Sequence, residues 1–287
     1  MAKGRELKGR IKSVENTRKI TRTMEMVATS KMKRAQDRVQ AARPYAAALG
    51  EVLSRLYSPE LAERFPLLRQ PVQPRRIAVL LLTSNRGLAG GFNANLIKEA
   101  RTTIASVEGR GAQVELHVVG RKGIGFFRYV GRAMATQRAD ITDRPSAADA
   151  ASLVDDLMAR FVSGALDGVY VIYSRFLGAL STPPTTLQVL PVQPPPAGEA
   201  AVARDYILAP SAEAILTELL PSYVRNSVYR ALAENEASFQ SSQRNAMKSA
   251  TDNATELLNV YKRTYNRARQ AQITQEIAEI VGGAAAL

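Results

Sequence analysis

The sixty residues from Ser222 to Val281 contain neither glycine nor proline. They are rich in Ala, Leu, Glu, Gln, Arg and Lys, which lose little conformational freedom on entering a helix. Pro221 precedes this stretch and Gly282 follows it, so we expect one helix that ends at the glycine. At about 1.5 Å per residue it would be roughly 90 Å long, far beyond the usual 11–12 residues or so. A helix of that length must pack against another helix or a partner protein.

A second long helix is predicted over residues 1–57. Apolar or small residues recur there at steps that alternate between four and three from Ala28 onward, which is the seam of a coiled coil. The seam positions are Leu7, Ile11, Val14, Ala28, Met32, Ala35, Val39, Ala42, Ala46, Leu49, Leu53 and Leu56, with the polar Arg18 and Thr21 between the two runs. Pro44 interrupts the pattern and would kink the helix or mark a join.

Between the two long helices the apolar pattern changes to short runs. Strands are predicted at 77–83, 114–119, 132–140, 168–173 and 185–192. Helices are predicted at 95–106, within 120–130 and after Ser146, whose side chain would cap the helix that follows. Strands that alternate with helices indicate a doubly wound α/β domain over about 75–192.

The predicted fold class is therefore α/β, with a long antiparallel coiled coil of the N- and C-terminal helices and an inserted Rossmann-like α/β domain. Residues 1–57 form the first helix, 58–210 the linkers and inserted domain, and 211–287 the last helix. The C-terminal helix is longer than the N-terminal one can cover. We expect its far end to have no partner within the chain.

The charge is concentrated at the N-terminal end. The net charge is +13, and residues 1–57 hold fourteen Lys and Arg against five Asp and Glu, whereas residues 211–287 are neutral. Lys31, Lys33, Arg34 and Arg38 place a basic face on the first helix. Such a face attracts nucleic acid, anionic lipid or an acidic protein, and charge alone does not distinguish them.

No residue pattern in the chain predicts an active site. There is no cysteine, and His117 is the only histidine, so a metal site or a catalytic triad is not expected. The turn with Gly87, Gly90 and Gly91 lacks both the dinucleotide-binding spacing and a phosphate-binding lysine, so a close strand-to-helix turn is expected there. Asp155 and Asp156 would point to different faces of a helix. We expect no catalytic residue, no cofactor and no metal.

No apolar run approaches the length of a membrane-spanning helix, and the first residues are basic. Composition therefore predicts a soluble chain in a cytoplasm-like compartment.

Four motifs resemble one known family. Residues 11–32 read IKSVENTRKITRTMEMVATSKM and residues 265–286 read YNRARQAQITQEIAEIVGGAAA, while SNRGLAGGFN at 84–93 and AMKSATDN at 246–253 lie between them. In this order they are similar to the gamma subunit of F-type ATP synthases, over the whole chain.

The resemblance implies a central rotor shaft without an active site of its own. Its partners would be the alpha and beta subunits of the catalytic head, the epsilon subunit and the membrane c-ring. It implies contacts with beta-subunit loops at Met24 on the first helix and at Arg269, Gln270 and Thr274 on the last. Asp205 and Tyr206 would contact epsilon or the c-ring. The resemblance implies no nucleic-acid partner. The protein would lie at a bacterial cell membrane, peripherally and on the cytoplasmic side.

The sequence departs from the family pattern at several positions. Phe239 and Gln243 replace an acidic residue and an arginine, with Arg244 one place later, so a beta contact there is in question. Asn85 and Ala89 stand where Asp and Cys are common. The alternative function is a basic coiled-coil nucleic-acid-binding protein, although the neutral segment 211–287 argues against it. A dinucleotide-dependent oxidoreductase ranks third.

Overall fold

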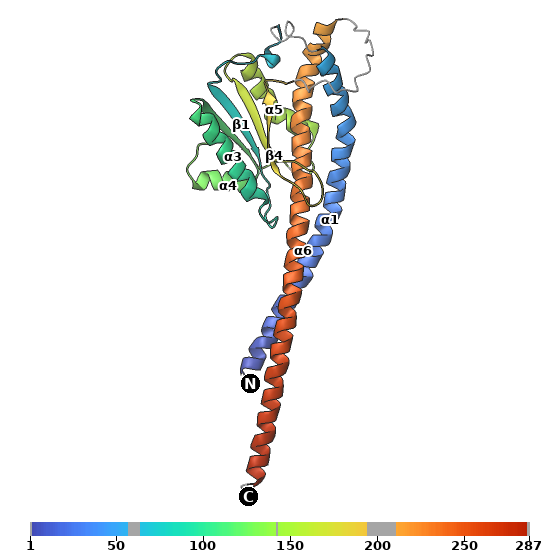
Figure 1. Cartoon of the computed structure of the whole chain (residues 1–287), viewed down its shortest axis with the longest axis vertical. Coiled ribbons are helices and arrows are strands. Elements are labelled where there is room, and N and C mark those ends of the chain that lie inside the picture. Colours follow the sequence, from blue (N-terminus) through green and yellow to red (C-terminus); the bar gives the residue numbers. More distant parts are fainter. Residues whose placement is uncertain (1, 57–63, 142, 194–210, 286–287) are drawn as a thin grey trace. The chain divides into compact units, whose positions relative to one another are not determined.

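The computed structural model describes residues 2–56, 64–141, 143–193 and 211–285 of the chain. These residues form two compact units. One unit joins residues 1–29 to residues 243–287, and the other comprises residues 30–242. Two long helices, α1 (Ala2–Leu56) and α6 (Ala212–Ala285), contribute residues to both units (Figure 1).

The second unit is built around a five-stranded sheet. Its strands are β1 (Arg76–Leu82), β2 (Gln113–Val119), β3 (Thr136–Arg138), β4 (Gly168–Ser174) and β5 (Pro184–Leu190). Their order is β3-β2-β1-β4-β5. The first four strands are parallel, as expected, and β5 pairs antiparallel with β4. The connection between β4 and β5 is too short for the crossover that a parallel pair requires, so β5 runs antiparallel.

Alternate residues of β1 face two different cores. Ile77, Val79 and Leu81 pack on the side of α3 (Phe92–Gly109) and α4 (Arg121–Tyr129). Ala78, Leu80 and Leu82 pack on the side of α5 (Ala147–Val162). The strand is buried on both faces, which explains its unbroken apolar sequence.

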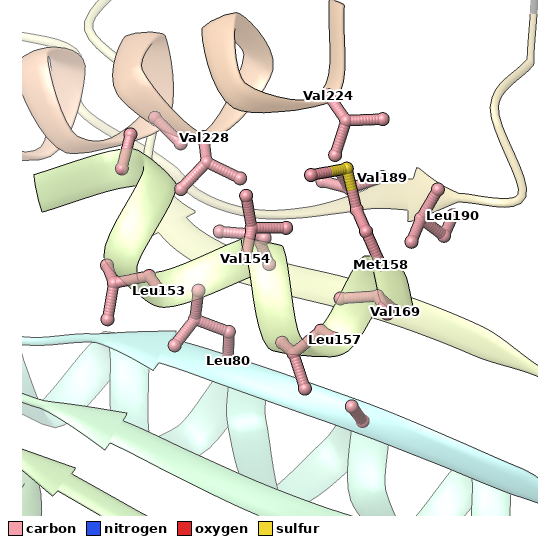
Figure 2. Packing of buried hydrophobic residues seen from close by; sticks show 14 of the residues in the cluster. Leu80, Leu153, Val154, Leu157, Met158, Val169, Val189, Leu190, Val224 and Val228 are labelled. Carbon is pink, nitrogen blue, oxygen red and sulfur yellow. The ribbon is translucent and has the colours of Figure 1, made fainter. Parts of the chain in front are cut away.

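Helix α5 lies between the sheet and α6. Figure 2 shows Leu157 of α5 directed toward β1, and Val154 and Met158 near Val224 and Val228 of α6. The helix begins at the predicted cap: the Ser146 hydroxyl accepts a hydrogen bond from the Asp149 backbone, and the Asp149 carboxylate accepts one from the Ser146 backbone. The α/β insert therefore packs around the first part of α6.

The two long helices lie within the predicted segments 1–57 and 211–287, and α6 differs from the prediction only at its glycines. Helix α6 begins before Pro221 and continues through Gly282, so the expected stop at the glycine is wrong. A glycine within a helix costs only about 1 kcal/mol, which does not end a helix by itself. Around Pro221, the buried Leu216 and Leu220 hold the helix in the core. Helix α1 likewise continues through Pro44.

Candidate partner-binding surfaces on the long helices

The predicted coiled-coil seam is present on α1. Every seam position from Leu7 to Leu56 is buried or half-buried. In the first unit, Ala28 is fully buried, and Met247, Ala254 and Leu258 of α6 are buried. Small Ala side chains together with Met and Leu thus form the packed side of the helix pair. Residues outside the seam are available to partners.

A partly buried hydroxyl pair defines the register of the two helices in this unit. The Thr21 and Thr251 hydroxyl oxygens are 2.8 Å apart, and Thr21 is 8% exposed. Eleven residues back along α1 and ten residues forward along α6, Arg10 hydrogen-bonds to Tyr261. The two pairs advance in opposite directions along the helices, which confirms the antiparallel prediction for this unit. A partly buried polar pair in an otherwise apolar seam favours one register.

The four predicted beta-contact residues lie at two separate levels of this helix pair. In the register of Thr21 and Thr251, the half-buried Met24 lies opposite a residue near 248. Arg269, Gln270 and Thr274 are exposed. They are about twenty residues further along α6, roughly 30 Å away at about 1.5 Å per residue. The structure therefore does not bring Met24 together with the other three. Asp205 and Tyr206 lie outside the described residues.

The end of α6 extends beyond the start of α1, as the helix lengths predicted. In the Thr21–Thr251 register, Ala2 lies opposite a residue near 270, and α6 continues to Ala285 (Figure 1). Ile273, Ile277 and Ile280 are 46%, 56% and 72% exposed. Their spacing of four and three places them along one face of the helix. Such an exposed apolar face indicates a partner surface.

Two further apolar residues on α1 were not among the predicted contacts. Ile20 and Val27 are 61% and 51% exposed and lie seven residues apart, so they share a face. Neither belongs to the seam pattern. Apolar residues that fall outside a seam are the sequence signal that would have identified them.

The predicted basic face of α1 is partly neutralised within the second unit. Lys31 Nζ lies 2.6 Å from Asp143 Oδ2, and Lys33 pairs with Asp37 at 2.8 Å. The hydrogen bond from Lys31 lowers the pKa of Asp143. Part of this charge is therefore used to attach α1 to the α/β insert.

Phe239, one of the departures from the family pattern, lies in the core. It is 4% exposed, and its ring meets Phe92 edge to face with centroids 5.5 Å apart. Phe92 is the first residue of α3, so this contact joins α6 to the helix that follows β1. A side chain buried in this way is not available to a beta subunit.

The glycine-containing turn serves packing within the α/β insert. Asn93 Oδ1 accepts a hydrogen bond from the Ser84 backbone at 3.0 Å. Asn85 Oδ1 accepts one from the Arg121 backbone, and Asn85 Nδ2 donates to the carbonyls of Ala139 and Ile141. An aspartate would lack that amide donor, which gives a physical role to the departure at Asn85. The turn leads from β1 to α3, and Asn85 links it by a hydrogen bond to the start of α4.

His117 is held as a core residue. Its Nδ1 lies 2.9 Å from the Thr136 hydroxyl, and burial lowers its pKa. The neighbouring Glu115 carboxylate accepts two hydrogen bonds from Arg160, at 2.7 and 2.6 Å. Over the described ranges no three His, Cys, Asp or Glu side chains gather as a metal site. No helix among the described residues is long and apolar enough to cross a membrane.

The sequence as a whole matches one protein family. A family model described as ATP synthase matches residues 3–287. The ATP synthase gamma chain of Gemmatimonas aurantiaca is 74% identical and aligns over 100% of this chain and 99% of its own length. This chain belongs to the ATP synthase gamma chain family. The gamma chain of Frankia casuarinae is 42% identical over 99% of this chain and 97% of its own.

Solved structures of the family share the fold. A chain of the Tetrahymena thermophila mitochondrial ATP synthase central stalk and c-ring is 26% identical, with a TM-score of 0.62 over 80% of this chain and 99% of that one. A rotor chain of the Euglena gracilis mitochondrial ATP synthase has a TM-score of 0.67 at 19% identity, over 95% and 99%. The predicted fold class and family are confirmed. The nucleic-acid-binding alternative is not supported.

Family membership decides the class of function. Gamma chains are non-catalytic subunits of ATP synthase, and the chain is associated with a membrane as part of that complex.

Proposed function

We propose that the chain is the central rotor shaft of an F-type ATP synthase. It couples ion flow through the membrane c-ring to the conformational cycle of the catalytic sites on alpha and beta. The observation that carries this function is the match to the gamma chain family over nearly the whole sequence. The exposed apolar face of Ile273, Ile277 and Ile280 supports it, because an unpaired helix end with apolar side chains requires a surrounding surface.

We further propose two levels of contact with the beta subunits. Met24 meets one set of beta loops, and Arg269, Gln270 and Thr274 meet another. The separation of these residues along the helix pair supports two distinct contacts. In a rotating shaft, such contacts transmit torque at different heights.

The remaining assignments rest on the family resemblance. Asp205 and Tyr206 contact epsilon or the c-ring. Residues 1–57 and 211–287 act as the shaft, and residues 58–210 carry the domain that lies near the c-ring. The complex places the chain at the cytoplasmic side of a bacterial cell membrane, where it is held peripherally.

Reconstitution tests the function. We expect the isolated chain to show no ATP hydrolysis. Mixed with the alpha and beta subunits of the same enzyme, it should elute with them as one complex that hydrolyses ATP faster than alpha and beta alone. Gel filtration and a coupled ATPase assay measure both results. Separate elution of the chain from alpha and beta would refute the proposal.

Met24→Lys tests the first beta contact. An ammonium group placed against a protein surface without a partner costs several kcal/mol. We therefore expect the reassembled enzyme to pump fewer protons per ATP hydrolysed, measured by dye quenching in vesicles alongside phosphate release.

Met26→Lys is the matched control. It adds the same charge two residues away, at a side chain that is 60% exposed on a different face. We expect its pumping ratio to match that of the unmodified enzyme. Equal losses in the two variants would contradict a contact specific to Met24.

A further inference from the structure

An open pocket of about 560 Å³ in the second unit is lined only by charged residues. It lies where α1, the segment before α5 and α6 meet. The lining residues are Lys31, Arg34, Arg38, Asp143, Arg144 and Glu236. Four cations thus face two carboxylates. A pocket whose lining residues are all charged, with more cations than carboxylates, suits a small anion.

Asp143 orients two of the cations. Its carboxylate receives the Lys31 ammonium at 2.6 Å, and its backbone carbonyl accepts a hydrogen bond from Arg38 at 3.2 Å. Arg34 lies between them in the sequence, and the spacing of three and four puts all three on one face of α1. One carboxylate cannot neutralise three cations, so positive charge remains at the pocket.

Glu236 is the second carboxylate and is largely buried. Burial raises its pKa to about 7. Asp143 adds to the rise, whereas the Gln240 hydrogen bond, Lys31 and Arg38 oppose it. Three further cations lie near Glu236. Arg34 and Arg144 line the same pocket, and Arg86 lines an adjoining cavity that Glu236 also lines.

Gln240 gives Glu236 a partner in either protonation state. Gln240 Nε2 donates to Glu236 Oε1 at 2.6 Å, while the buried Gln240 Oε1 has no partner among the described residues. Rotation of the amide by half a turn would present that oxygen to a protonated carboxyl. Gln240 can therefore donate its N–H to the ionised Glu236 carboxylate, or accept the O–H of the neutral acid through its carbonyl oxygen.

We propose that this pocket binds a tetrahedral oxyanion through Lys31, Arg34 and Arg38, and that binding is accompanied by proton uptake at Glu236. An anion beside Glu236 disfavours the ionised carboxylate, so the bound state holds the proton more tightly. By linkage, protonation of Glu236 strengthens anion binding by the same factor. Between pH 8 and pH 6 Glu236 passes from mainly ionised to mainly neutral, and affinity therefore rises as pH falls.

Sulfate is the probe, because its charge does not change between pH 6 and pH 8. The full chain is titrated with sodium sulfate against sodium chloride at equal ionic strength, and the arginine Nε–Hε NMR signals are followed. We expect the Arg34 and Arg38 signals to shift along one saturable curve. A coupling of about one pKa unit would make binding about fivefold to tenfold tighter at pH 6 than at pH 8.

Three variants test the assignment. Arg34→Glu reverses one pocket charge and should weaken sulfate binding about tenfold or more. Arg101→Glu makes the same change at an exposed position of α3 outside the pocket and should leave the affinity unchanged. Glu236→Gln imitates the neutral acid, so its affinity should stay near the pH 6 value at both pH values.

Each opposite result overturns part of the proposal. Linear, unsaturated shifts, or equal losses in the Arg34 and Arg101 variants, would show that sulfate has no site in this pocket. A pH dependence that persists in Glu236→Gln would show that Glu236 does not take up the proton.

Discussion

Gly120→Ala is expected to unfold the α/β insert or to destabilise it by more than about 4 kcal/mol. Gly120 joins β2 to α4 with φ +96°, a conformation that costs side-chain-bearing residues energy. A Cβ there would also lie 2.1 Å from the Thr83 carbonyl oxygen, at the end of β1. The Thr83 carbonyl and the Gly120 backbone that would carry the Cβ are both held in place by packing, so neither can move aside cheaply. Urea unfolding followed by circular dichroism measures the loss.

Two other glycines separate the causes of this effect. Gly111 has φ +85° but open space around it. Gly111→Ala should therefore cost only about 1–2 kcal/mol, which is the cost of the left-handed backbone conformation without a clash. Gly125 lies in α4, has no positive φ and has open space where a Cβ would lie. Gly125→Ala should therefore stabilise the protein by up to about 1 kcal/mol. If Gly120→Ala lowered the free energy of unfolding no more than Gly111→Ala does, the close approach of Gly120 to Thr83 would be wrong.

Ala28→Glu is expected to separate the helix pair of the first unit. Ala28 is fully buried in the seam, where the helices approach closely because the side chains are small. Glutamate adds bulk and a charge without a partner, which costs several kcal/mol. We expect hydrogen exchange to accelerate strongly at the backbone amides of residues 20–29 and 247–258. The amides of β1 and β4, in the other unit, should keep their protection.

The adjacent residue provides the control. Val27 is 51% exposed, so Val27→Glu adds the same side chain outside the seam and should change stability by no more than about 0.5 kcal/mol. Rapid exchange in both variants would place the helix contact elsewhere on α1.

Much of the local structure followed from the sequence. The four-three spacing from Ala28 to Leu56 predicted the buried side of α1, because burial along a helix repeats every three or four residues. The apolar run from Ile77 predicted a strand covered on both faces. Ser146 was predictable as a helix cap because the backbone N–H that its hydroxyl satisfies lies only three residues away.

The candidate contact sites were predicted less completely. Motif resemblance selected Met24 and Arg269, yet it carried no information on their separation along the helix pair. It also did not select Ile20 and Val27, whose exposure becomes evident only once the seam is known.

The sequence by itself determined the two long helices, the mainly parallel α/β insert and the family, because each depends on local periodicity or on matched residue order. Only the tertiary structure decided the features that depend on residues distant in the chain. These are the register of Thr21 with Thr251, the burial of Phe239 against Phe92 and the position of Glu236 beside the basic residues of α1. The physical reason is that burial and electrostatic environment arise from neighbours in space, which spacing along the sequence does not specify.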